Sequence, residues 1–126
     1  MNIALIAHDG KKPELVSFFL QNKKLFLNSN IYATATTGSH LGNVGIEVNK
    51  VLSGPLGGDA QIAALIAEGK IDLVFFFRDP LGKHPHEPDV QMLMRLCDVH
   101  NVPMATNPAA ARLMLSALKG QLYDEK

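Results

Sequence analysis

Hydrophobic residues along this chain gather into short continuous runs, and longer segments between the runs repeat apolar positions with a helical period. Continuous apolar runs are typical of strands covered on both faces of a sheet, and the longer segments are typical of the covering helices. The runs predict strands at Ile3–Ala7, Ile31–Thr36, Val48–Leu52, Leu73–Phe77 and Val102–Thr106. Because strands and helices alternate, we expect an α/β fold with three layers and a doubly wound, mainly parallel sheet of about five strands.

The positions of proline and glycine set the expected limits of the helices. Pro13 suits the first turn of one helix, and a shorter helix is expected after Gly38. Three more helices are expected over residues 59–68, 88–100 and 108–118. Because the chain has 126 residues, no linker and no internal repeat, we expect residues 1–126 to form a single domain.

The composition argues against several classes of partner. Twelve basic residues balance twelve acidic ones, so we expect no basic surface for nucleic acid or for an anionic membrane. The N-terminal apolar run is too short for a signal peptide, and no segment reaches the length of a membrane span, which predicts a cytoplasmic protein. The only cysteine, Cys97, lies among apolar residues of an expected helix, where a buried and unreactive thiol is the usual outcome.

The segment from Ser53 to Asp59 is the most informative candidate for a binding site. Three of its residues are glycines, and an apolar helix is expected to begin at Asp59. Glycines let the backbone approach a ligand, and unpaired N–H groups at a helix start favour a small anion such as phosphate. The alternative is an ordinary tight turn in which Asp59 is a first-turn acid that the helix dipole stabilises. This segment alone leaves the two interpretations open.

Chemically useful residues also follow the other predicted strands. His8, Asp9 and Lys12 follow the first strand, and Thr34, Thr36 and Thr37 end the second. Ligands of open α/β sheets bind beyond the carboxyl ends of the strands, so these residues are expected to converge. Threonine hydroxyls and one lysine match the needs of phosphate, although threonine is also a common strand residue and helix cap.

The loop that follows the fourth strand is dense in titratable residues and is stiffened by prolines. It carries His86 and Asp89, which could hold an imidazole and a carboxylate at a fixed distance from Asp59 for proton transfer. The alternatives are a turn-forming role for Asp79 and a first-turn role for Asp89. A metal site made of His8, His84 and His86 has no recognised ligand spacing, so we expect no metal.

Several of these segments occur together in one order: ALIAHD (4–9), YATATTG (32–38), LSGPLGGD (52–59), DPL (79–81), PHEPDV (85–90) and NVPMATN (101–107). In this combination the chain resembles the methylglyoxal synthase family from Ile3 to about Arg112. The resemblance implies a methylglyoxal synthase-like domain that converts dihydroxyacetone phosphate to methylglyoxal and inorganic phosphate without a metal or cofactor. It also implies a homohexamer that phosphate inhibits.

The resemblance assigns roles to individual residues of this chain. It implies that Asp59 is the catalytic base, that His86 and Asp89 handle protons with it, and that Asp9 and Asp79 are acids close to the site. The implied contacts to substrate and phosphate are His8, Lys12, Thr34, Ala35, Thr36, Thr37, Ser53, Gly54 and His86.

A non-catalytic module that binds a small anionic effector is the main alternative, because the same fold also serves as a regulatory domain. Carboxylates repel an anion, so a simple anion-binding module gains nothing from Asp59 and Asp89 beside a phosphate site. The combination of these acids with His86 therefore favours an enzyme.

Overall fold

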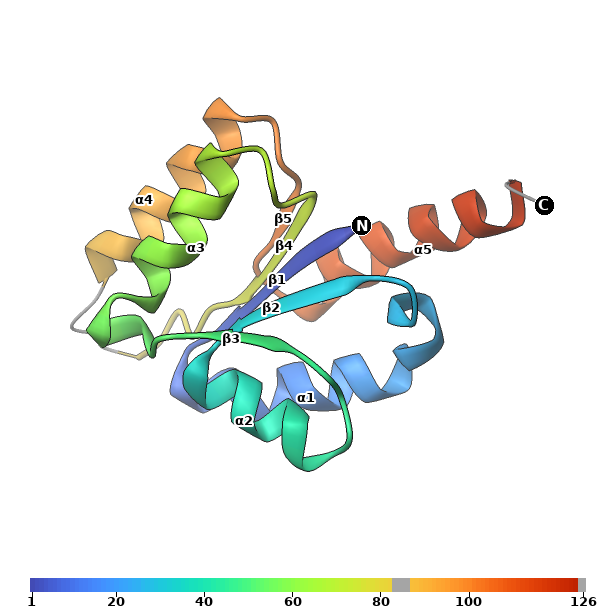
Figure 1. Cartoon of the computed structure of the whole chain (residues 1–126), viewed down its shortest axis with the longest axis horizontal. Coiled ribbons are helices and arrows are strands. Elements are labelled where there is room, and N and C mark those ends of the chain that lie inside the picture. Colours follow the sequence, from blue (N-terminus) through green and yellow to red (C-terminus); the bar gives the residue numbers. More distant parts are fainter. Residues whose placement is uncertain (83–86, 125–126) are drawn as a thin grey trace.

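Five strands form one parallel sheet in the order β3-β2-β1-β4-β5 within residues 1–82 and 87–124, which are the residues that the computed structural model describes (Figure 1). Their bounds are β1 Asn2–Ala7, β2 Asn30–Thr34, β3 Asn49–Val51, β4 Leu73–Phe77 and β5 Met104–Ala105. The predicted parallel α/β sheet is therefore confirmed. The edge strands β3 and β5 are shorter than expected because each has a neighbour on one side only.

The main helices are α1 Lys12–Gln21, α2 Ala35–Asn43, α3 Gly58–Ala67, α4 Glu87–Val99 and α5 Pro108–Asp124, and short 3₁₀ helices cover η1 Asp9–Lys11, η2 Lys23–Phe26 and η3 Gly54–Leu56. Two predicted limits were wrong. The second strand ends at Thr34, and α2 begins at Ala35 rather than after Gly38. The last helix extends to Asp124, past the expected end at Leu118, since a single interior glycine costs a helix only about 1 kcal/mol.

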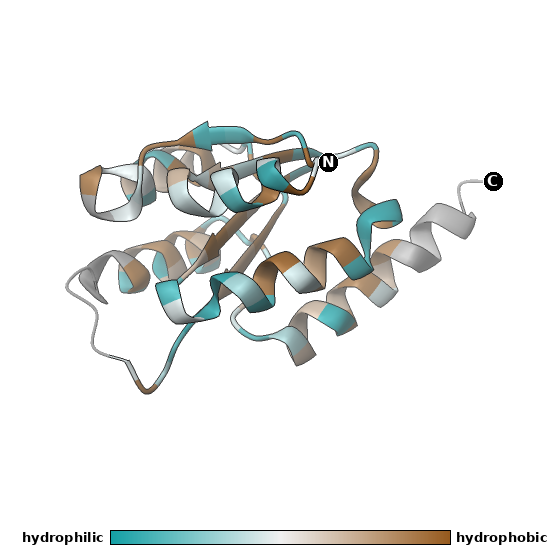
Figure 2. Ribbon diagram, turned by 90° about the horizontal axis from the view of Figure 1, so that it is seen from below, coloured by the Kyte–Doolittle hydropathy of each residue, from teal (hydrophilic) through white to brown (hydrophobic). Residues whose placement is uncertain are grey.

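Two helical layers cover the two faces of the sheet (Figure 1). Alternate side chains of β1 and β4 point to opposite faces, so both strands are buried on both sides. One core contains Ile3, Leu5, Phe75 and Phe77 with residues of α1, α2 and α5, and the other contains Ala4, Ile6, Val74 and Phe76 with residues of α3 and α4. Figure 2 shows the central strands as almost continuously hydrophobic between these layers. The three-layer prediction is confirmed.

The order of the strands determines where a ligand can bind. The chain runs outward from β1 through β2 to β3 and then returns to the other side of β1 with β4. The connections after β1 and β4 therefore leave in different directions, and a crevice at their carboxyl ends is the usual ligand position in such sheets. Within the described residues, no helix is long and apolar enough to span a membrane.

Candidate active site

His8 lies immediately after β1 and is fixed from the neighbouring strand. Its backbone N–H donates to the carbonyl oxygen of Phe77, and its ring Nδ1 accepts a hydrogen bond of 3.0 Å from the backbone N–H of Asp79. The ring also packs edge-on against Phe76, and the residue is 2% exposed. Because Nδ1 accepts a hydrogen bond, the proton of the neutral ring lies on Nε2. His8 thus offers a hydrogen-bond donor at the carboxyl edge of the sheet.

The loop after β1 also contacts the loop after β4. A Cβ atom on Gly10 would lie 3.1 Å from Oδ2 of Asp79, so this carboxylate rests against the glycine backbone. The other oxygen of Asp79, Oδ1, accepts the backbone N–H of Leu81. These contacts hold the two loops together at the crevice between β1 and β4.

Lys12 is the first residue of α1 and forms an ion pair with Asp9, with 2.5 Å between Nζ and Oδ1. Only 13% of the lysine side chain is exposed, against 95% for Asp9. A cation at the start of a helix lies at the unfavourable end of the helix dipole, which Asp9 offsets. This arrangement keeps a mostly buried positive charge beside the carboxyl end of β1.

The threonine segment forms the start of a helix, not the end of a strand. Thr34 adopts an extended conformation as the N-cap of α2, and its hydroxyl makes no capping hydrogen bond. Thr36 and Thr37 therefore belong to the first turn, where backbone N–H groups have no partner inside the helix. The Oγ1 atom of Thr37 is buried and makes no hydrogen bond to any described residue. Such a helix start is suited to an anion.

The glycine-rich segment forms a short 3₁₀ turn that leads into α3. Ser53 precedes this turn, and Gly57 has a φ of 109°, which a residue with a side chain rarely adopts. A Cβ atom on Gly58 would overlap the carbonyl oxygen of Leu52, so no other residue fits there. The turn itself therefore requires Gly57 and Gly58, which agrees with the alternative interpretation of this segment as an ordinary tight turn.

Asp59 nevertheless has an environment that a capping role does not explain. The residue is 2% exposed, and both carboxylate oxygens lie 3.2 Å from the position that a Cβ atom of Gly54 would occupy. The absence of a side chain at Gly54 lets the acid lie directly on the backbone of the turn. Burial of a carboxylate has to be offset by hydrogen bonds or ion pairs, and buried acids held in this way are frequent in active sites.

The structure brings most of the predicted residues to one edge of the sheet. Parallel pairing sets Leu5 of β1 opposite Ala33 of β2, which aligns the residues that follow both strands. The backbone N–H of Ala35 donates to the carbonyl oxygen of Leu52 at 3.4 Å and so joins the starts of α2 and of the glycine turn. The segments that converge here contain His8, Asp9, Lys12, Thr34, Ala35, Thr36, Thr37, Ser53, Gly54, Asp59 and Asp79.

The side chains of the remaining two predicted catalytic residues, His86 and Asp89, lie outside the part of the chain that the structure describes. His86 is outside the described residues, as is His84. Asp89 belongs to the first turn of α4, which begins one residue before the expected position, but its side chain is outside the described part of the structure. In the described part, no group of three or more His, Cys, Asp or Glu side chains is arranged to hold a metal ion.

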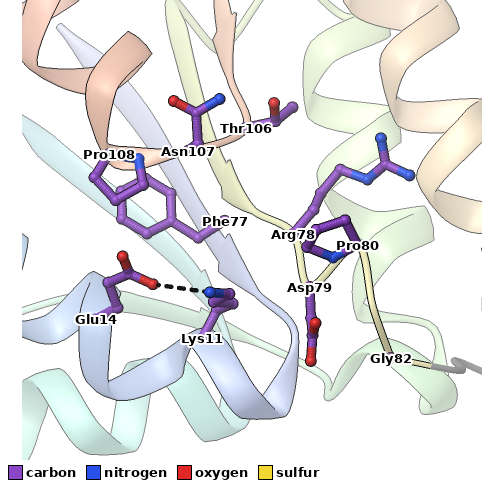
Figure 3. A pocket seen from close by; sticks show the side chains of 10 residues that line it. All are labelled: Lys11, Glu14, Phe77, Arg78, Asp79, Pro80, Gly82, Thr106, Asn107 and Pro108. Carbon is purple, nitrogen blue, oxygen red and sulfur yellow. Dashed lines mark ion pairs between the residues drawn. The ribbon is translucent and has the colours of Figure 1, made fainter.

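A neighbouring hollow of about 680 Å³ lies beyond β4 and β5, and Figure 3 shows its lining. The lining side chains are Lys11, Glu14, Phe77, Arg78, Asp79, Pro80, Gly82, Thr106, Asn107 and Pro108. Lys11 is paired with Glu14 across 3.4 Å, and the guanidinium of Arg78 points away toward Met94 of α4. Among the described residues, Asp79 is the one member of the predicted site that lines this hollow, and the lysine there is paired with Glu14. We therefore assign the candidate active site to the helix starts around Asp59.

Sequence reasoning missed two contributors to this site. Gly10 leaves room for the carboxylate of Asp79, and Gln61 of α3 accepts a hydrogen bond from the backbone of Leu52. Neither residue belongs to a recognisable motif, since the partner of each is distant in the sequence.

A parallel sheet of this order, with a glycine turn, a threonine-bearing helix start and a buried acid at its carboxyl edge, defines a class of small α/β protein. The model of the MGS-like domain family matches residues 14–106, so the chain belongs to this family. Among its relatives are proteins named methylglyoxal synthase. One from Carboxydothermus hydrogenoformans is 54% identical over 119 residues, which is 94% of this chain and 98% of the relative.

Two further comparisons agree with this assignment. The methylglyoxal synthase of Acholeplasma laidlawii is 54% identical over 122 residues, covering 96% of this chain and 100% of the relative. The crystal structure of methylglyoxal synthase from Elizabethkingia anophelis NUHP1 superposes with a TM-score of 0.87 and is 46% identical, covering 91% of this chain and 76% of that one.

Proposed function

We propose that this protein is a methylglyoxal synthase, a carbon–oxygen lyase that converts dihydroxyacetone phosphate to methylglyoxal and inorganic phosphate. Relatives more than 50% identical over nearly the whole chain carry this name. The observation that carries the proposal is the buried carboxylate of Asp59, which lies against Gly54 beside a helix start suited to phosphate. Binding phosphate alone requires no acid there, whereas proton abstraction beside a phosphate does.

The first step is proton abstraction from the hydroxymethyl carbon next to the substrate carbonyl. Asp59 takes this proton as the general base, and its 2% exposure keeps bulk water away from the carboxylate. The product is an enediolate, whose negative charge develops on the former carbonyl oxygen. We assign the hydrogen bond to this oxygen to the Nε2–H of His8, because the backbone N–H of Asp79 donates to the other ring nitrogen.

The second step expels phosphate from the adjacent carbon. The carbon–carbon double bond of the enediolate shifts to the phosphate-bearing carbon as its C–O bond to phosphate breaks. The hydroxyl group of the former hydroxymethyl carbon loses its proton and becomes the aldehyde, and the resulting enol becomes methylglyoxal when its terminal carbon takes up a proton and its hydroxyl group releases one. Elimination is fast only when the breaking bond lies perpendicular to the enediolate plane. Donors around Thr34, Thr36 and Thr37 with the charge of Lys12 hold phosphate in that orientation and stabilise the departing dianion.

The other predicted residues complete the proposal. Ala35, Ser53 and Gly54 supply backbone at the phosphate end of the site, and Asp9 holds Lys12. His86 and Asp89, the two partners implied by the family resemblance, return protons to the enol and to the leaving phosphate. Each transferred proton is supplied by substrate or side chains, so the reaction is balanced without a metal, cofactor or water.

The proposal extends to the whole chain as a single domain that assembles into a homohexamer. Leu56 and Leu81 are 73% and 95% exposed, and subunit contacts in such an assembly would cover apolar side chains of this kind. Light scattering of the purified protein measures the subunit number. Inorganic phosphate, as the second product, occupies the same donors and inhibits the enzyme in competition with substrate.

The direct test mixes metal-free protein with dihydroxyacetone phosphate and measures methylglyoxal and free phosphate. We expect the two products in equal amounts, with turnover unchanged by exhaustive chelation. Formation of glyceraldehyde 3-phosphate would instead indicate an isomerase. Phosphate binding without either product would identify a non-catalytic effector-binding module.

A further inference from the structure

Gln61 makes a contact that none of the roles above uses. It lies in α3, two residues after Asp59, and its Oε1 atom accepts a hydrogen bond of 2.7 Å from the backbone N–H of Leu52. Leu52 is nine residues earlier, immediately after the edge strand β3. The side chain therefore reaches back from the helix that carries the proposed base to the strand that leads into the glycine turn.

The backbone of Leu52 is also tied to the phosphate end of the site. Its carbonyl oxygen accepts the backbone N–H of Ala35, the first residue of α2, at 3.4 Å. The same oxygen lies where a side chain on Gly58 would be. Leu52 thus connects the start of α2 with the start of α3, and Gln61 holds one end of this connection.

Leu52 lies between a short edge strand and the glycine turn, in which Ser53 accepts the backbone N–H groups of Leu56 and Gly58. The strand before it has three residues and pairs on one side only, and the Leu52 side chain is 51% exposed. A weakly held peptide at this point would let the two helix starts shift relative to each other. A displacement of about 1 Å between reacting groups can slow a reaction on the order of 100-fold, so even a modest restraint here affects turnover.

We propose that Gln61 is a positioning residue that holds Asp59 in register with the anion-binding start of α2 through the backbone of Leu52. This inference rests on the proposed function for its catalytic part. The inference adds that turnover and phosphate affinity both depend on the side chain of Gln61, which contacts neither substrate nor product.

The test compares three variants. Gln61→Met keeps the length of the side chain and removes the acceptor, whereas Gln61→Glu keeps an acceptor oxygen and suits the first turns of a helix. Gln21→Met makes the same substitution at the exposed end of α1, at the opposite edge of the sheet. For each variant, kcat and KM are measured together with phosphate affinity by calorimetry and the exchange rate of the Leu52 amide.

We expect Gln61→Met to lose protection of the Leu52 amide, to lower kcat about tenfold and to weaken phosphate binding severalfold. Gln61→Glu should restore most of kcat, with weaker phosphate binding from its added charge, and Gln21→Met should behave as the wild type. A merely structural role would change melting temperature and leave kcat of the folded enzyme unaltered.

Wild-type kcat and phosphate affinity in folded Gln61→Met would overturn the proposal, as would a Gln61→Glu variant no better than Gln61→Met. If the wild-type protein formed no methylglyoxal, the proposed function would fail, and the phosphate affinities of the same variants would still decide the role of Gln61. A wild-type protein that neither turned over substrate nor bound phosphate would overturn both.

Discussion

Asp59 combines burial with a position beside backbone that favours anions, and this combination is unusual for a residue with only a structural role. An amide at this position keeps the shape of the side chain and removes its basicity. We therefore expect Asp59→Asn to remain folded and to lose turnover on the order of 100-fold or more, measured as kcat under saturating substrate. Near-normal turnover would move the role of base to another acid, with Asp89 the first to test.

Lys12 and Lys11 are adjacent lysines with different partners, which makes them a matched pair. Lys12 is mostly buried and paired with Asp9, whereas Lys11 is paired with Glu14 at the neighbouring hollow. Lys12→Met should weaken phosphate binding about tenfold or more, since a hydrogen bond to a charged group contributes about 1.5 to 3 kcal/mol. Lys11→Met should leave it nearly unchanged. Calorimetric titration of both variants with phosphate measures these affinities. Equal losses of affinity in the two variants would contradict a specific role for Lys12.

Cys97 lies on the buried face of α4, as the sequence predicted, and burial raises the pKa of its thiol from 9.0 to about 11, with a smaller contribution from Asp98. The folded protein therefore keeps the proton at pH values where the unfolded chain releases it. The free energy of unfolding should fall by about 2 kcal/mol between pH 9 and pH 11 from this group. Denaturant unfolding of Cys97→Ala should show a shallower decline over this range, and identical slopes would contradict the assignment.

At the scale of elements, the start of α3 depends on a close approach between two backbones. The carbonyl oxygen of Leu52 occupies the space of any side chain on Gly58, whereas Gly42 in α2 has no heavy atom within 4 Å of such a position. Gly58→Ala should destabilise the fold by about 2 kcal/mol or more and reduce turnover, because Asp59 moves with the helix start. Gly42→Ala should be neutral or stabilising by about 0.5 to 1 kcal/mol. Chemical denaturation measures the free energy of unfolding of both variants. Similar values for Gly58→Ala and Gly42→Ala would contradict the proposed close contact at Gly58.

At the scale of the whole molecule, one ligand should stabilise the entire fold. The proposed phosphate donors come from segments after β1, β2 and β3, so an anion bound there would link helices on both faces of the sheet. Phosphate at 100 times its dissociation constant should add about 2.7 kcal/mol to the free energy of unfolding and raise Tm by roughly 10 °C. Thermal unfolding with and without phosphate measures this shift. A Lys12→Met variant with the full shift at the same concentration would exclude this site as its source.

The amino-acid sequence by itself determined the class of fold and named the residues of the candidate site. The apolar runs identified the sheet because burial on both faces leaves a local pattern, and the glycines around residue 57 identified the turn because its backbone tolerates little else. The positions of His8, Lys12 and Asp59 after strands were equally visible, since carboxyl ends of parallel strands share one edge.

Other properties depend on which distant segments become neighbours, and only the tertiary structure decided them. The start of α2 at Ala35 follows from its hydrogen bond to Leu52, and the proton position on His8 follows from the N–H of Asp79 across the crevice. The burial of Asp59 requires the bare backbone of Gly54, and Gln61 acts on a partner in another element. A periodic pattern reports only which face of an element is covered. Contacts between loops arise from packing, so no local pattern encodes them.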